Sequence, residues 1–196
     1  MKINFPNIIN KDGQAHYFGT IFNIEQNDYF FKELLSKIEW VNESLIMFGK
    51  EITTKRKVAF YADNMIHYTY SNKTKKGIEW TPLLLEIKQF ITNHTGCNYN
   101  ACLLNLYHDG NEGMGWHSDD EKEIVPNSSI ASLSFGAERK FALKHKVNKE
   151  AHSIILENGS LLEMSGSFQK NWLHALPKFK KIDSPRINLT FRQMMV

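Results

Sequence analysis

The second half of this 196-residue chain is a succession of short strand-like segments separated by turn residues, and this pattern limits the possible folds more than any other feature. Apolar and β-branched runs recur at 101–107, 129–135, 140–144, 153–156, 160–164, 172–176 and 187–192. Strands of this length at regular spacing are typical of a β-sandwich or a jelly roll. We therefore predict a β-rich core over residues 100–196.

The first half predicts two helices packed outside that core. The first helix is capped by Asn27 or Asp28 and ends near residue 40, with its apolar residues at helical spacing. The second is capped by Thr81, has Pro82 at its first helical position and ends at Gly96. Between them, aromatic and lysine-rich runs over 45–70 predict β-hairpins, and segment 17–22 is either an edge strand or a packed arm.

The composition favours one folded domain. With 42% apolar residues, the chain can bury a substantial core, and we expect a single domain over 1–196, with the helices and hairpins in 1–99 and the β-core in 100–196. Cys97 and Cys102 are too few for a disulfide framework, so we expect both to be reduced and structural. No run has the length of a membrane span or the character of a signal peptide, which predicts a cytoplasmic protein without a membrane partner.

His117 and Asp119 form two thirds of a possible metal site. If the segment is extended, the two side chains project from one face of a strand. Such a pair is weak evidence alone, because it often occurs by chance in solvated turns. His174 is the favoured third ligand, since it is a lone polar residue in an apolar run, although other histidines compete for the role. Two histidines and one carboxylate would form the facial triad of non-haem Fe(II) oxygenases.

Two predicted strands have one apolar face and one hydrogen-bonding face. The polar faces carry Asn105 and Tyr107 on one strand, and Arg186, Asn188, Thr190 and Arg192 on the other. A plain antiparallel sheet with one solvated side would produce the same alternation. Two arginines beside amide and hydroxyl groups instead favour a binding site for a small dianion, because guanidinium binds carboxylate through two parallel hydrogen bonds.

Basic residues gather in several separate segments, although the net charge is only +3. They lie at 50–57, 73–76, 139–149 and 178–181, whereas acidic residues concentrate at 119–123. Any one cluster is more simply explained as solvated lysine. Together they favour a polyanion held against a metal site.

Five motifs together give the chain a family resemblance: Asn105-Leu106-Tyr107, His117-Ser118-Asp119-Asp120-Glu121, the segment 130–137, Trp172-Leu173-His174 and the segment 185–192. In this order and spacing they resemble the AlkB family of Fe(II)- and 2-oxoglutarate-dependent dioxygenases. The resemblance implies an α+β protein with a double-stranded β-helix, or jelly roll, flanked by N-terminal helices and a nucleotide-recognition hairpin lid. It also implies Fe(II), 2-oxoglutarate and O2.

The resemblance assigns roles to individual residues. It implies that His117, Asp119 and His174 bind iron and that 2-oxoglutarate contacts Asn105, Tyr107, Arg186, Asn188, Thr190 and Arg192. Asp120 matches the position that contacts the damaged base. From strand geometry rather than from the resemblance, Ser118 points the opposite way to His117 and Asp119 and should be replaceable. In the first half, Phe48, Gly49 and Lys50 resemble a finger that fills the gap left by a flipped base, Arg56 a contact to the opposite strand, and Tyr68, Thr69 and Tyr70 a base-stacking lid.

The implied activity is oxidative removal of N-alkyl groups from DNA bases such as 1-methyladenine and 3-methylcytosine. Hydroxylation of the N-alkyl carbon would release an aldehyde, with succinate and CO2 as co-products. Duplex DNA is the expected substrate, and a monomer is expected because base flipping needs one free face; in a bacterium the protein would act at the nucleoid. Two alternatives stay open: the same chemistry on RNA or single strands, and a nucleic-acid binding module without catalysis.

Overall fold

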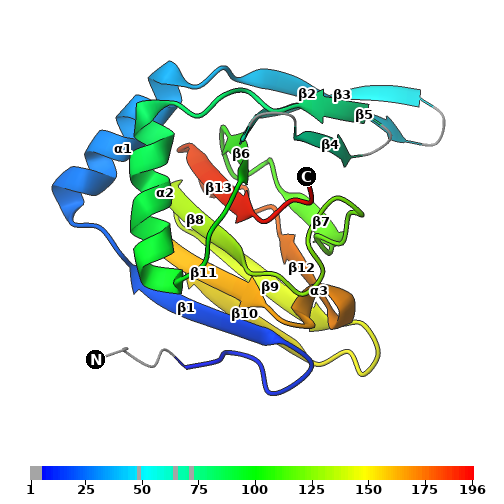
Figure 1. Cartoon of the computed structure of the whole chain (residues 1–196). Coiled ribbons are helices and arrows are strands. Elements are labelled where there is room, and N and C mark those ends of the chain that lie inside the picture. Colours follow the sequence, from blue (N-terminus) through cyan, green and yellow to red (C-terminus); the bar gives the residue numbers. More distant parts are fainter. Residues whose placement is uncertain (1–5, 48–49, 64–65, 71–72) are drawn as a thin grey trace.

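Two antiparallel sheets face each other and form the core of the molecule (Figure 1). The computed structural model describes residues 6–47, 50–63, 66–70 and 73–196, with the side chains of 43–47, 50–52, 67–70 and 73–75 outside this description. The seven-stranded sheet has the order β1-β11-β8-β13-β6-β3-β2, and the four-stranded sheet has the order β10-β9-β12-β7. The predicted jelly roll is thus confirmed.

The strands of the β-core largely follow the predicted segments. They are β6 (Ala101–Tyr107), β7 (Met114–His117), β8 (Ile130–Gly136), β9 (Arg139–His145), β10 (Ala151–Leu156), β11 (Ser160–Ser165), β12 (Trp172–Leu176) and β13 (Arg186–Arg192). The short helix α3 (Phe168–Asn171), which the sequence pattern does not predict, lies directly before β12.

Helices α1 (Ile24–Lys37) and α2 (Pro82–Thr95) cover the outer face of the larger sheet (Figure 1). The start and end of α2 confirm the prediction. The Thr81 side chain accepts a hydrogen bond from the Leu84 backbone N–H at 3.3 Å, and Gly96 ends the helix in the left-handed conformation with φ of 71°. Both features satisfy backbone groups that a helix end leaves unpaired.

The predicted start of the first helix is wrong. The helix begins at Ile24 and is capped by Asn23, whose side chain forms a capping box with Gln26. Asn27, predicted as a cap, instead lies on the buried face beside Phe30, and its Nδ2 donates to the Asn158 carbonyl at 3.4 Å. A polar residue on the buried face therefore looked like a helix start in the sequence.

The first half also contributes strands. Segment 14–20 forms β1 (Gln14–Thr20), an edge strand that pairs with β11, so the edge-strand alternative is the correct one. Strands β2 (Val41–Met47) and β3 (Lys50–Ala62) pair antiparallel, and β4 (His67–Tyr70) pairs with β5 (Lys73–Lys76) in a separate sheet. The predicted hairpins over 45–70 are confirmed as backbone.

Side chains on the two faces of β13 lie in different environments: one face packs in the core against the helices, and the other lines the pocket between the sheets. Ile187, Leu189 and Phe191 are fully buried in the cluster formed with the helices. The alternate residues, which carry the polar groups, face the space between the two sheets. The solvated-sheet alternative is therefore excluded for this strand.

Cys97 and Cys102 are both free thiols, as predicted. Among the described residues, no helix combines the length and the apolar character that crossing a membrane requires.

Candidate metal centre and anion pocket

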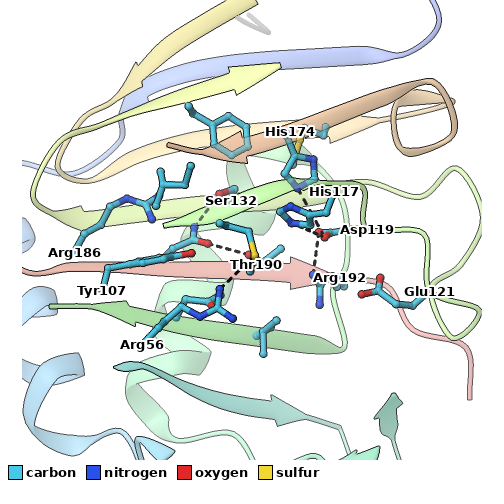
Figure 2. Close-up of a pocket in the computed structure, with 17 residues that line it drawn as sticks. Arg56, Tyr107, His117, Asp119, Glu121, Ser132, His174, Arg186, Thr190 and Arg192 are labelled. Carbon is cyan, nitrogen blue, oxygen red and sulfur yellow. Dashed lines mark hydrogen bonds and ion pairs between the residues drawn. The ribbon is translucent and has the colours of Figure 1, made fainter. Parts of the chain in front are cut away.

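Strand pairing brings the three predicted metal ligands together. His174 on β12 lies opposite His117 on β7, and Asp119 follows two residues later. The Asp119 Oδ1 atom is 3.7 Å from His117 Nε2 and 3.8 Å from His174 Nε2. Figure 2 shows the three side chains converging at one end of a pocket. One ligand atom from each residue lies within 4.8 Å of the others, so the three could hold one metal ion.

Neighbouring groups orient two of these ligands. The backbone carbonyl of Gly115 is 2.9 Å from His117 Nδ1; because a carbonyl can only accept, Nδ1 carries the proton and Nε2 keeps its lone pair for a metal. Arg192 Nη2 donates to Asp119 Oδ2 at 2.9 Å, which leaves Oδ1 facing the two histidines. Arg192 therefore holds Oδ2 of the carboxylate in place, and Oδ1 remains available to bind a cation.

Burial and charge set the protonation of the ligands. Burial alone would raise the pKa of the Asp119 carboxyl, but Arg192 and the two histidines outweigh it and lower that pKa to about 2. Burial lowers the pKa of His174 to about 3. At neutral pH Asp119 is therefore ionised and His174 is neutral, which are the forms that bind a metal.

The lowered pKa of His174 predicts an acid-sensitive fold in the metal-free protein. Between pH 6.5 and about 3, the unfolded chain binds a proton on this histidine and the folded protein does not, so stability falls as pH falls through this range. Urea denaturation in chelator should show the midpoint falling on acidification, and falling less steeply in a His174→Leu variant. An identical pH dependence in the variant would contradict this assignment.

The polar face of β13 forms a hydrogen-bonded pocket wall. Arg186 Nη2 donates to Ser134 Oγ at 2.9 Å, Asn188 Nδ2 donates to Ser132 Oγ at 2.9 Å, and Thr190 Oγ1 donates to Asn188 Oδ1 at 3.1 Å. Figure 2 shows Arg186 and Tyr107 at the end of the pocket opposite the metal ligands. The Arg186 guanidinium lies 5.5 Å from the centre of the Tyr107 ring.

The pocket fits an anion. Arg186 is 3% exposed, and its lowered pKa of about 10, caused by burial, still leaves it a cation at neutral pH. Among the described residues no carboxylate lies within ion-pair distance of Arg186, and its Nε and the Oδ1 of nearby Asn105 have no hydrogen-bond partner. A buried cation without a counter-charge is costly, so the site favours a negatively charged ligand.

The charges of the pocket suit a metal ion and a dianion together. The lining includes three arginines and two carboxylates: Arg56, Arg186, Arg192, Asp119 and Glu121. A divalent cation and a dianion add no net charge to this set. The residues present therefore fit a pocket that would hold both Fe(II) and 2-oxoglutarate.

Two of the residues predicted to contact DNA, Arg56 and Asp120, lie in or beside the pocket. Arg56 is 6% exposed and its Nη1 lies 3.4 Å from the Met114 sulfur, so it points into the pocket. The predicted contact of Arg56 to the opposite strand therefore stays a prediction, and the structure places this arginine in the lining of the pocket. Asp120 is exposed beside the pocket, where Ser118 Oγ donates to its Oδ2 at 3.1 Å, and its contact to a base stays a prediction.

The remaining predicted contacts lie largely outside the description. Phe48 and Gly49 fall outside the described residues, whereas Lys50 lies opposite Met47 in the β2–β3 pair with its side chain undescribed. Residues 68–70 are described as backbone in β4. Their assignment to a finger and a lid stays a prediction.

Sequence reasoning missed several residues that line or support the site. Ser132 and Ser134 alternate on β8 and bind the β13 side chains, and Glu121 also lines the pocket. The alternation of the two serines along an apolar strand was the available signal. No comparable signal exists for Gln169, whose Oε1 accepts from the Asp119 backbone N–H at 3.0 Å.

Buried Arg139 joins two loops next to the strands of the smaller sheet. Its guanidinium donates to the carbonyls of Asp109 at 3.4 Å, Glu112 at 2.9 Å and Pro177 at 2.8 Å. These carbonyls belong to the turn before β7 and the loop after β12. The arginine therefore holds together the two segments next to the strands that carry the histidine ligands.

Gly110 allows the same two segments to touch, and its replacement should be disruptive. A β-carbon at Gly110 would collide with the Phe179 carbonyl, whereas one at Gly115 would meet nothing within 4 Å. We expect Gly110→Ala to lower the free energy of unfolding by about 1–3 kcal/mol and Gly115→Ala by less than about 0.5 kcal/mol. Urea denaturation of both variants measures this difference, and equal effects would show that the loop contact is unimportant.

Comparison with known proteins agrees with this site. The model of the 2OG-Fe(II) oxygenase superfamily matches residues 14–192. DNA oxidative demethylase ALKBH2 of Homo sapiens is 36% identical over 199 residues, covering 96% of this chain and 76% of that protein. Alpha-ketoglutarate-dependent dioxygenase alkB homolog 3 of Bos taurus is 36% identical over 180 residues, covering 87% of this chain and 62% of that protein.

The solved structure of OsALKBH1 has the same fold, with a TM-score of 0.66 at 13% identity over 94% of this chain and 98% of that one. The jelly roll, the triad of metal ligands and the cationic pocket agree with the family match over nearly the whole chain. The chain therefore belongs to the 2OG-Fe(II) oxygenase superfamily and, within it, to the AlkB family of Fe(II)- and 2-oxoglutarate-dependent dioxygenases.

Proposed function

We propose that this protein removes N-alkyl groups oxidatively from DNA bases of the 1-methyladenine and 3-methylcytosine type. The observation that carries the proposal is the 36% identity, over 96% of the chain, to a protein named DNA oxidative demethylase. The converging triad and the cationic pocket support it, because they provide places for the metal and the cosubstrate of such a reaction.

In this proposal, His117, Asp119 and His174 bind Fe(II). The 2-oxoglutarate contacts Asn105, Tyr107, Arg186, Asn188, Thr190 and Arg192. Bound iron with 2-oxoglutarate and O2 supplies the oxidant that hydroxylates the N-alkyl carbon, after which the base loses an aldehyde and succinate and CO2 remain. Arg192 fixes the Asp119 carboxylate, and Arg186, which Ser134 holds in place, would bind a carboxylate of the dianion.

Several described features suit a nucleic-acid substrate. The loop after β12 presents exposed Lys178, Lys180 and Lys181 around Phe179, which is 54% exposed. Lysines of this kind bind backbone phosphates, and an exposed aromatic ring can stack on a base. Arg56 and Glu121 add a donor and an acceptor to the pocket, where they could contact the edge of an inserted base.

The proposed reaction is tested with methylated oligonucleotides. Single-stranded and duplex DNA carrying 1-methyladenine, and RNA of the same sequence, are incubated with Fe(II), ascorbate and 2-oxoglutarate in air. We expect formaldehyde release with DNA. Turnover of RNA alone would favour the RNA alternative, and no turnover with any substrate would favour a binding module.

We further propose that duplex DNA is the preferred form and that Phe48 is the tip of a finger that replaces the flipped base. Phe48→Ala should then lower activity on duplex DNA about tenfold or more, since base stacking contributes about 1–3 kcal/mol, and should leave activity on single strands nearly unchanged. Equal losses on both substrates would contradict the finger role.

We also propose that the protein acts as a monomer in the cytoplasm, at the nucleoid in a bacterium. A monomer leaves the face around the pocket free for a duplex. Light scattering during size-exclusion chromatography would reveal a stable dimer, which would contradict this proposal.

A further inference from the structure

Lys146, in the turn after β9, contacts the segment that contains the metal ligand Asp119. Its Nζ donates to the Ser118 Oγ at 3.0 Å and to the Gln169 backbone carbonyl at 2.9 Å, and it lies 3.8 Å from Asp120 Oδ2. Two of the three ammonium donors are thus used in hydrogen bonds, and the Asp120 carboxylate adds an ion pair. The side chain is only 28% exposed, so the lysine is held within a polar network rather than free in solvent.

The network extends directly to a metal ligand. Gln169, whose backbone Lys146 binds, uses its own side-chain Oε1 to accept the Asp119 backbone N–H at 3.0 Å. Lys146 and Gln169 therefore hold residues 118–120 from two sides. Ser118, predicted to be replaceable because it points away from the metal, is a member of this network.

The network also connects the three ligands. Gln169 belongs to α3, which is anchored by the buried ring of Phe168 and leads directly into β12 with His174. Asp119 lies beyond the end of β7, so the sheet ladder that fixes His117 does not extend to it. Side-chain contacts therefore help to set the distance between Asp119 and His174: Arg192 binds the Asp119 carboxylate, and Gln169 binds its backbone N–H.

We propose that Lys146 is a positioning residue of the metal centre: it ties segment 118–120 to α3 and thereby places the Asp119 carboxylate opposite His174. Lys146 contacts neither metal nor substrate in this role. The inference rests on the proposed assignment of the iron ligands. It concerns metal affinity, so it can be tested without DNA or 2-oxoglutarate.

Whether replacing Lys146 strengthens or weakens metal binding distinguishes a positioning role from a simple effect of its charge. Removing a positive charge near a cation site should by itself strengthen metal binding. Loss of a residue that orients a ligand should weaken it, typically 10–100-fold. Lys170 offers a matched control, because it is exposed on α3 and lines the same outer pocket as Lys146 and Asp120.

The experiment is a titration with Mn(II), which binds the same ligand types without oxygen chemistry, followed by electron paramagnetic resonance. We expect Lys146→Met to weaken Mn(II) binding at least about 10-fold. Lys146→Arg, which keeps the charge and the donors, should restore most of the affinity, and Ser118→Ala should cause a smaller loss. Lys170→Met should bind Mn(II) as tightly as the wild type or more tightly.

Two outcomes distinguish failure of this inference from failure of the ligand assignment. If Asp119→Ala lowers Mn(II) affinity and Lys146→Met does not, the positioning role is overturned and the ligands stand. If Asp119→Ala leaves the affinity unchanged, the ligand assignment fails and the role of Lys146 fails with it. Urea denaturation of Lys146→Met should give nearly the wild-type midpoint; a large loss of stability together with no rescue by arginine would show a purely structural role.

Discussion

Replacing Asp119 with alanine should abolish turnover and also destabilise the metal-free protein. The carboxylate is 5% exposed, faces both histidine Nε2 atoms through Oδ1 and binds Arg192 through Oδ2. Its removal takes away the one anionic ligand and leaves a buried guanidinium without its carboxylate. Breaking such a pair costs about 3–5 kcal/mol of folding free energy.

The two losses can be measured separately. Metal affinity should fall by more than the roughly 100-fold that loss of an outer partner can cause, and demethylation should fall below detection. Asp119→Asn is the matched control: its amide oxygen can still accept from Arg192, so stability should recover substantially while metal binding stays weak. Activity of Asp119→Ala above about a tenth of the wild type would exclude Asp119 as a ligand.

Replacing Arg186 with methionine should greatly weaken cosubstrate binding but, unlike the loss of Asp119, should barely change the stability of the protein. This guanidinium is 3% exposed and donates to Ser134, but no described carboxylate pairs with it. In the free protein its burial is costly, and in the proposed complex it binds a carboxylate of 2-oxoglutarate. A charge-assisted bidentate interaction of this kind contributes about 3 kcal/mol or more, which corresponds to at least roughly 100-fold in affinity.

The measurement is the Kd for 2-oxoglutarate under anaerobic conditions with Mn(II) bound. Arg186→Met should raise it about 100-fold, and Arg186→Lys, which keeps the charge and loses the planar fork, should fall between the variant and the wild type. The free energy of unfolding, measured by urea denaturation, should change by less than about 1 kcal/mol, because no internal ion pair is lost. An unchanged Kd would show that the dianion binds elsewhere.

The parts of the fold that sequence reasoning predicted depend on local rules. Thr81, Pro82 and Gly96 mark the ends of α2 because capping involves residues close in sequence. The alternation from Arg186 to Arg192 predicted two different faces, since side chains in a strand point to opposite sides. Asn27 misled the prediction of α1, because a polar residue on a buried helix face has the same composition signal as a cap.

The parts that were not predictable depend on contacts between distant segments. His174 is the third ligand because it lies opposite His117 in the β12–β7 pair. The residue pattern alone only favours His174 among the histidines, and the resemblance of the motifs is what selects it. In the sequence, Arg139 and Lys146 are simply members of a basic cluster. Their carbonyl and hydroxyl partners lie 23 to 38 residues away in the chain, and nothing in the local sequence identifies them.

We propose that one pocket of this protein couples 2-oxoglutarate oxidation to removal of an alkyl group from a DNA base. The most direct test compares product stoichiometry with a duplex carrying one 1-methyladenine and with the same duplex unmodified. We predict one formaldehyde and one repaired base for each succinate formed from the methylated duplex beyond the background seen with the unmodified one. Equal succinate formation from both duplexes, with the methylated base intact, would contradict the claim.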